Sequence, residues 1–405
     1  MSNSVLPPYS PAPPVPSYSP EPAHDEQRVE HTPRAHSHPT GNYITQCGHD
    51  AVVLTEQDPH AKFPTYGRHA TINGFVTLED RETVSDVVLK IKGKMDVIAI
   101  GASLTTKLID SSYTVWSSEN SRTSMCPSAI PFAVALPSRF QDFDGMSFPL
   151  PPSYDVPNIT NSGPFFKTSY MLSVTITRTR SRKFQFLSKH KTIPIRFTYS
   201  PRARPWRPIQ PFSDFMSDIK TSPAEFRQVL AQMKPRPKSL VQPIDLHLFL
   251  PTVEIFGLED TIPFHVQLTG PVASLREFVP DSDPALGKTT IAGSLVRQIV
   301  VELNGRKASR NIVIGEAKLC SRPPGAAADM REASLDWDGE VRSNADTIVG
   351  MFDAGCVRIQ DFLVIELRPP NIHTTTEFTT LRHSHPIKLV TESWLDSSAL
   401  RDDPR

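Results

Sequence analysis

The chain has 405 residues, enough for two domains of ordinary size plus tails. Its 43 Lys and Arg residues balance its 43 Asp and Glu residues, so the net charge gives no indication of a nucleic-acid partner. The 40 prolines are about twice the usual share of ~5%. This composition disfavours a helical bundle and is typical of short strands joined by proline-rich loops.

The four cysteines have no Cys-x-x-Cys or Cys/His spacing, which predicts free thiols in a reducing compartment. No apolar run approaches the ~20 residues of a membrane-spanning helix, and the N-terminus lacks the features of a secretory signal. We therefore expect a soluble cytoplasmic protein. The histidines do not fall at metal-ligand spacing and no catalytic nucleophile–base pair is found, so we expect no metal, no cofactor and no enzymatic activity.

Residues 1–42 form a low-complexity segment rich in Pro, Ser and His, for which we predict a disordered arm with polyproline II character. Two tetrapeptides in it resemble the Tyr-containing proline motifs that WW domains bind. Leu6-Pro7-Pro8-Tyr9 fits the relaxed Leu/Pro-Pro-x-Tyr pattern, and Val15-Pro16-Ser17-Tyr18 is a weaker variant of it. A preformed polyproline II stretch docks in an aromatic groove with its Tyr as anchor. The alternative is that a proline-rich arm carries such tetrapeptides through composition alone.

From residue 43 to residue 200, runs with strand-like alternation recur with turn signals between them. In Phe165–Arg178, the side chains of Tyr170, Leu172, Val174 and Ile176 are expected to share one buried face. Many short strands without an intervening helical pattern predict a β-sandwich. The predicted strands are Thr71–Leu78, Val84–Ile91, Val97–Ala102, Leu104–Ile109, Ser112–Trp116, Ile130–Leu136, Phe165–Arg178 and Thr192–Tyr199.

Residues 201–240 read as a proline-rich linker with one short helix over 223–233. Ser222 is expected to cap it, and Phe226, Val229, Leu230 and Met233 fall at helical spacing. This helix is interpreted either as an element that faces a partner or membrane, or as a linker helix packed on a sandwich.

A second β-rich block is predicted over residues 241–392, followed by a disordered tail over 393–405. Residues 322–347 are expected to form an inserted, poorly ordered loop. The predicted strands are Ile244–Leu250, Val253–Phe256, Ile262–Leu268, Thr289–Leu303, Asn311–Leu319, Val357–Leu367 and Ile387–Thr391.

Several segments together resemble the motifs of arrestin-like proteins of fungal type, the alpha-arrestin or arrestin-related trafficking adaptor family. They are Phe63–Leu78, Ile130–Pro137, Leu150–Tyr154, Ile262–Pro271 and Leu381–Val390. The resemblance implies an all-β protein of two tandem immunoglobulin-like, arrestin-type β-sandwiches without a catalytic centre. It also implies a cytoplasmic adaptor, peripheral at the plasma membrane or endosomes, that links the cytosolic tails of membrane-protein cargo to a WW-domain HECT-type ubiquitin ligase for endocytosis. The alternative is a retromer-like sorting or structural scaffold without ligase recruitment.

Two further motifs concern partners. Pro151-Pro152-Ser153-Tyr154 matches Pro-Pro-x-Tyr strictly, but it lies between predicted strands, where we interpret it as a structural turn. A basic stretch without nearby acids either binds an anionic partner, such as lipid headgroups or an acidic cargo tail, or is a solvated hairpin end. Its cations include Arg178, Arg180, Arg182, Lys183, Lys189 and Lys191. No charged cluster of the kind that locks visual-type arrestins in their basal state is evident.

Overall fold

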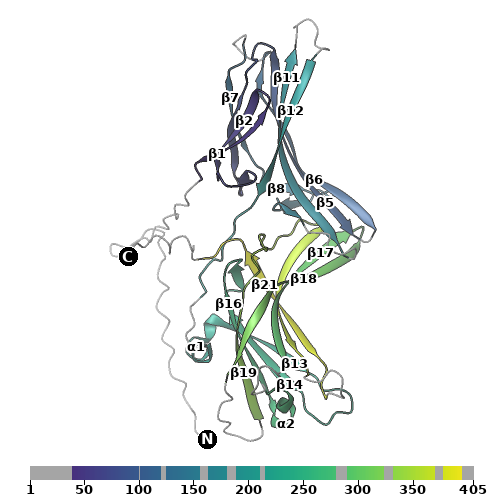
Figure 1. Ribbon diagram of the computed structural model, residues 1–405. Helices are drawn as coiled ribbons and strands as arrows, with labels where there is room; N and C mark the ends of the chain where they lie inside the picture. Colours follow the sequence, from purple (N-terminus) through teal and green to yellow (C-terminus); the bar gives the residue numbers. More distant parts are fainter. Residues whose placement is uncertain are drawn as a thin grey trace, which may run out of the picture. The chain divides into compact units, whose positions relative to one another are not determined.

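The computed structural model describes residues 39–99, 101–119, 125–155, 163–179, 188–209, 215–279, 290–322, 332–369 and 377–394. Most of these residues lie in strands (Figure 1), which confirms the expected all-β class. Helix within the described ranges is confined to α1 (Phe215–Thr221), η2 (Pro223–Glu225), α2 (Val272–Leu275) and η3 (Arg276–Phe278). None of these helices has the length and apolar character needed to cross a membrane.

The first half of the chain forms two main sheets. One is four-stranded and antiparallel, in the order β1 (Gly41–Cys47), β2 (Asp50–Gln57), β4 (Thr71–Thr77) and β7 (Ala129–Ala135). The other is six-stranded, in the order β3 (Thr65–Tyr66), β12 (Ser188–Tyr199), β11 (Phe165–Thr179), β5 (Val84–Ala99) and β6 (Ala102–Ser117), with β10 (Tyr154–Asp155) beside β11. A small hairpin of β8 (Arg139–Gln141) and β9 (Ser147–Pro149) completes this half.

A single core lies between these two sheets. The expected alternation of β11 is confirmed, because Tyr170, Leu172, Val174 and Ile176 are all buried. They belong to the same apolar cluster as inward-facing residues of β2, β4 and β7 in the four-stranded sheet. The period-2 pattern of the sequence therefore corresponds to strands with one face on a shared core.

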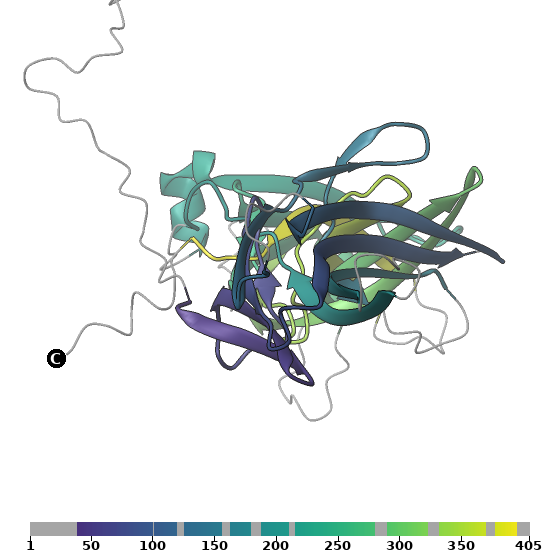
Figure 2. The ribbon, with the colours of Figure 1, turned by 90° about the horizontal axis from the view of Figure 1, so that it is seen from above.

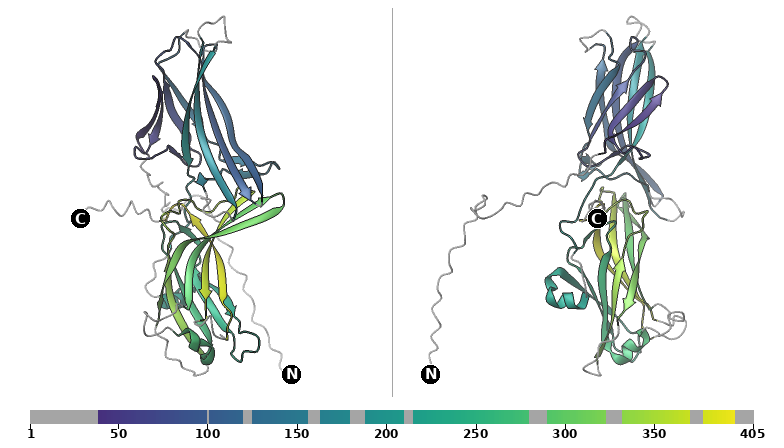
Figure 3. Two further views of the ribbon diagram at one scale, coloured as in Figure 1. Left: turned by 45° about the vertical axis from the view of Figure 1, so that its right-hand side comes forward. Right: turned by 60° about the vertical axis from the view of Figure 1, so that its left-hand side comes forward.

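The second half is built on one nine-stranded sheet that curls around its own core. Residues of strands far apart in the sheet, such as Leu248 and Leu389, belong to one buried cluster. The strand order is β13 (Phe226–Met233), β14 (Ile244–Pro251), β16 (Ile262–Pro271), β19 (Glu332–Val341), β18 (Arg306–Ser321), β17 (Ile291–Leu303), β20 (Val357–Leu367), β21 (Leu381–Val390) and β15 (Ile255–Gly257). Helix α1 lies outside this sheet, as the views from above and from the side show (Figures 2 and 3).

The expected helix over 223–233 is wrong. Only Pro223–Glu225 is helical, as one 3-10 turn, and the following residues form strand β13. This strand pairs with β14 along its whole length, from Phe226 opposite Pro251 to Met233 opposite Ile244. A free sheet edge thus overrides an apolar spacing that also suits a helix.

Two other expectations are corrected. The predicted strands Val97–Ala102, Leu104–Ile109 and Ser112–Trp116 belong to one long hairpin of β5 and β6. The loop expected over 322–347 contains β19, which lies between β16 and β18. Strand β19 buries Leu335, Trp337 and Val341, and acidic residues alternate with them in the sequence, as is typical of an antiparallel strand.

The two halves meet around a buried ion pair. Arg297 of β17 lies opposite Asp361 of β20 and donates two hydrogen bonds to it, Nε to Oδ1 at 2.8 Å and Nη2 to Oδ2 at 3.0 Å. Tyr154 of the first half lies close enough to Arg297 to help raise the pKa of its guanidinium. Its ring packs against Phe352 of the second half, and Phe352 also contacts Phe166.

This pair is held ionised by its own geometry. Both side chains are almost fully buried. Burial alone would lower the pKa of the Arg297 guanidinium, but the hydrogen bonds and the charge of Asp361 raise it. The first half therefore contacts a charged pair within the second half through Tyr154.

The β13 assignment can be tested by two truncations. Met233 is 1% exposed and Leu230 is 64% exposed, although an amphipathic helix would bury both. Met233→Ala should lower the free energy of unfolding by about 2–5 kcal/mol, and Leu230→Ala should change it by no more than about 0.5 kcal/mol. Urea titration of both variants is the measurement, and equal losses would contradict the strand.

Candidate functional site

The basic stretch lies where two hairpin ends of the first half come together. Strand β11 ends at Thr179 and β12 begins at Ser188, and the last pairs between them include Arg178 with Lys189. The turn between β1 and β2 consists of Gly48 and His49. Gly48 has a φ of +59°, a conformation that favours glycine and allows this tight turn.

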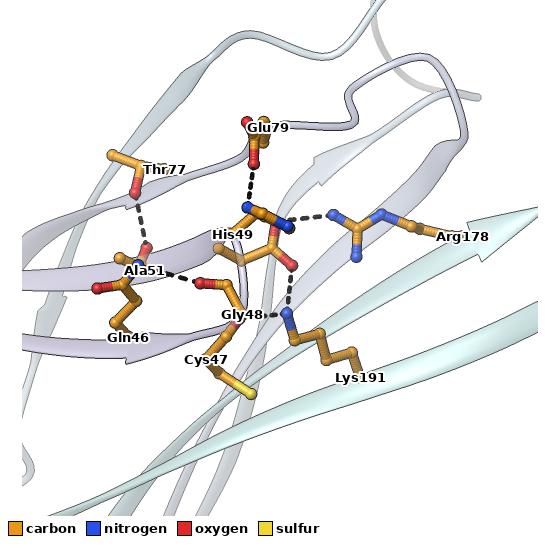
Figure 4. Close-up of polar contacts among 10 residues, drawn as sticks. Gln46, Cys47, Gly48, His49, Ala51, Thr77, Glu79, Arg178 and Lys191 are labelled. Carbon is orange, nitrogen blue, oxygen red and sulfur yellow. Dashed lines mark hydrogen bonds and ion pairs between the residues drawn. The ribbon is translucent and has the colours of Figure 1, made fainter.

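Asp50 is the centre of this site. It is the first residue of β2 and is 2% exposed. Its Oδ1 accepts a hydrogen bond from Nη2 of Arg178 at 2.7 Å, and its Oδ2 accepts one from Nζ of Lys191 at 2.8 Å. Lys191 also donates to the carbonyl oxygen of Cys47 (Figure 4). One carboxylate of the four-stranded sheet thus holds cations from two strands of the other sheet.

The charge state of Asp50 follows from these contacts. Burial would raise the pKa of its carboxyl, but hydrogen bonds and charges of Arg178 and Lys191 outweigh burial and hold the pKa below the ordinary value. Asp50 is therefore ionised at neutral pH. The cluster also leaves Nε of Arg178 buried without a hydrogen-bond partner among the described residues.

The cations of the basic stretch differ in whether their charge is neutralised within the protein. Arg178 and Lys191 both pair with Asp50, so the expected lack of nearby acids is wrong for these two. Lys189 is exposed to solvent. Arg180, Arg182 and Lys183 lie outside the described residues. A second, exposed contact, between Nδ1 of His49 and Oε2 of Glu79 at 2.6 Å, lies beside the cluster (Figure 4).

Pro151-Pro152-Ser153-Tyr154 is tied into the fold through its backbone. Tyr170 donates its hydroxyl hydrogen to the Pro151 carbonyl at 2.5 Å, and Thr168 donates to the Pro152 carbonyl. The Ser153 amide donates to the Tyr199 carbonyl at 2.8 Å, and the Tyr154 amide donates to the Thr168 hydroxyl at 2.7 Å. These contacts support the interpretation of this motif as a structural turn.

The remaining candidates offer no catalytic arrangement within the described residues. All four cysteines are free thiols, and burial raises the pKa of Cys126 to about 11, which disfavours a reactive thiolate. No group of three or more His, Cys, Asp or Glu side chains is placed to hold a metal ion in that part of the chain. Both Pro-Pro-x-Tyr-type tetrapeptides of residues 1–42 lie outside the described residues.

No protein-family model and no curated protein matches this chain.

Sequence reasoning missed two acidic residues that organise the charges. Asp50 stands immediately before the apolar run Ala51-Val52-Val53-Leu54, which was not predicted as a strand. Arg297 and Asp361 are charged residues of opposite sign within two predicted apolar strands, and this could have indicated a buried ion pair. The sequence of either strand does not show, however, that the two strands are neighbours in the sheet.

The role of Asp50 predicts an acid-dependent loss of stability. A group with a lowered folded-state pKa stabilises the fold above its ordinary pKa of 3.8, and the contribution disappears as the pH falls through the lowered value. Asp50→Asn should therefore lower the free energy of unfolding by about 1–3 kcal/mol at pH 7, because two cations lose a buried partner. The difference from the wild type should shrink below pH 3.8.

Urea unfolding at pH 7 and in acid measures both effects. Asp110→Asn is the control, since Asp110 also meets two lysines, Lys90 at 3.2 Å and Lys107 at 3.0 Å, but at a more exposed position. This control should change the stability much less. Equal effects of the two substitutions would contradict the structural role of Asp50.

Proposed function

We propose that this protein is a non-catalytic adaptor in membrane-protein trafficking, with two tandem arrestin-type, immunoglobulin-like β-sandwiches as its scaffold. It binds the cytosolic tail of a membrane-protein cargo and recruits a WW-domain HECT-type ubiquitin ligase for ubiquitin-dependent endocytosis. Its place is the cytoplasm, at the surface of the plasma membrane or endosomes. The all-β architecture and the motif resemblance support the proposed scaffold.

The observation that carries the proposal is the basic hairpin end fixed by Asp50. Arg178 and Lys191 neutralise the buried carboxylate and hold the ends of β11 and β12 in place. Lys189 is exposed beside this cluster. We assign the binding of an anionic partner to Lys189 together with Arg180, Arg182 and Lys183, the other cations of the basic stretch. An acidic or phosphorylated cargo tail supplies the matching charge, and anionic lipid headgroups are a second source of it.

Ligase recruitment is assigned to the N-terminal tetrapeptides and not to Pro151–Tyr154. A WW domain reads an accessible polyproline II backbone and an accessible Tyr. Pro151 and Pro152 are buried, and their carbonyl groups already accept hydrogen bonds. The alternative function, a retromer-like scaffold with the same architecture, differs in that it needs no WW ligand.

A WW-domain pulldown separates these functions. Tyr9→Ala combined with Tyr18→Ala should abolish capture of the full-length chain, as should deletion of residues 1–20. Tyr154→Ala should retain capture while lowering the free energy of unfolding by about 2–3 kcal/mol, because it removes a ring from the junction. Tyr154→Phe is the matched control, since it keeps the ring and loses only the hydroxyl. Capture that survives the arm variants would favour the scaffold alternative.

The anionic partner can be tested without breaking the Asp50 cluster. Arg180→Glu, Arg182→Glu and Lys183→Glu together should weaken binding to an acidic peptide or to anionic vesicles by on the order of 100-fold at low salt. Raising the salt should reduce wild-type binding strongly. Arg306→Glu, Lys307→Glu and Lys318→Glu, exposed cations of β18, make the same charge change elsewhere. Peptide titration and vesicle sedimentation are the measurements, and equal loss in the two triple variants would refute the site.

A further inference from the structure

A cavity of about 260 Å³ lies where the turn Pro149–Ser153 of the first half meets two segments of the second half. Those segments are 348–353 and 388–391, the second of which covers the last residues of β21 and the residue after it. The cavity is concave but open to solvent, and no residue of the Asp50 cluster lines it. Its volume is slightly below the usual ~300–1,000 Å³ of small-molecule sites. Its size therefore suits a ligand with one hydrocarbon chain and not a bulky ligand or one with two hydrocarbon chains.

Much of the wall is apolar. Pro151 and Pro152 line one side, and Met351 and Phe352 line the other. Ile348, at 70% exposed, and Met351, at 37% exposed, are large apolar side chains that the fold leaves partly in water. A ligand chain that covers them gains the free energy of removing apolar surface from water.

The charged groups of the wall are unequal in their availability. Among the described residues, Asp353 is the one carboxylate that lines the cavity, and both of its oxygens are occupied. Oδ1 accepts from the Gly355 amide at 2.9 Å, and Oδ2 accepts from Nε of Arg358 at 2.8 Å. Arg68 and Lys388 also line the cavity and are exposed. Neither side chain forms an ion pair or hydrogen bond with any residue that the structure describes. The site thus offers two uncompensated cations beside an apolar wall.

We propose that this cavity binds a single-chain anionic amphiphile, an alkyl carboxylate or alkyl phosphate. The chain lies against the proline turn and Phe352, and Arg68 and Lys388 bind the head group. Guanidinium and ammonium groups both suit carboxylate and phosphate oxygens. The ligand contacts both halves, and it depends on neither the cargo site nor the ligase site.

Titration calorimetry with the full chain tests the ligand class. Dodecanoate and dodecyl phosphate, both kept below micelle-forming concentrations, are the two anionic probes. Dodecyltrimethylammonium has the same chain with the opposite charge, and acetate and inorganic phosphate have the head groups without the chain. At least one anionic probe should bind saturably, and the three controls should not. Absence of saturable binding by both anionic probes, or equal binding of the cationic probe, overturns the proposal.

Variants and a local probe place the ligand. Arg68→Glu combined with Lys388→Glu should weaken binding at least tenfold, whereas Lys92→Glu, an exposed cation of β5 outside the cavity, should change it less than twofold. Arg68→Gln with Lys388→Gln is the milder pair if charge reversal impairs folding. The Met351 methyl resonance should shift on binding, and that of Met171, 39% exposed and outside the cavity, should not. Equal loss in the Lys92 variant, or an unshifted Met351 methyl, also overturns the proposal.

Discussion

The junction of the two halves depends on the buried pair of Arg297 and Asp361. Removing two charges from water costs several kcal/mol per ion, and only good geometry with further hydrogen bonds offsets that cost. The pair has the fork-shaped, two-bond geometry that best meets this requirement. Tyr154 of the first half helps to raise the pKa of the Arg297 guanidinium, so separating the halves would remove a favourable neighbour of a buried charge. The ion pair therefore makes the contact between the halves specific and not merely apolar.

The same constraint explains why the proline turn is part of the scaffold. Tyr154 lies near Arg297, whose pKa it helps to raise, and its ring packs against Phe352. Three residues upstream, the Pro151 carbonyl accepts a hydrogen bond from the buried Tyr170. The first and last residues of this Pro-Pro-x-Tyr motif, Pro151 and Tyr154, are therefore both held by contacts within the fold. The turn also forms one wall of the cavity, so the contacts that fix Tyr154 shape the apolar surface beside Arg68 and Lys388.

Much of the fold could be predicted from the sequence where one face of a strand is apolar. The alternation of β11 was sufficient to assign Tyr170 and its neighbours to the core. The prediction failed where local spacing suits two structures: Phe226, Val229 and Met233 fit a helix, but the free edge of β14 made them a strand. It also failed for β19, because the run Pro323–Ala328, rich in Pro, Gly and Ala, suggested a loop over the whole of 322–347. Edge pairing and burial against distant strands are tertiary facts, which a local pattern does not contain.

The candidate site was predictable only in part for a related reason. The sequence shows a run of cations near the end of β11, but it does not show which of them meet a carboxylate. Asp50 lies 128 positions from Arg178 in the chain, and it becomes a neighbour only because the two sheets share a core. This pairing divides one basic stretch into two roles. Arg178 and Lys191 fix the hairpin end, and cations without such a partner are the ones whose charge remains for another molecule. A cation that binds an anionic partner must not already be paired with a carboxylate of the folded chain. Counting cations along the sequence does not show which of them are unpaired.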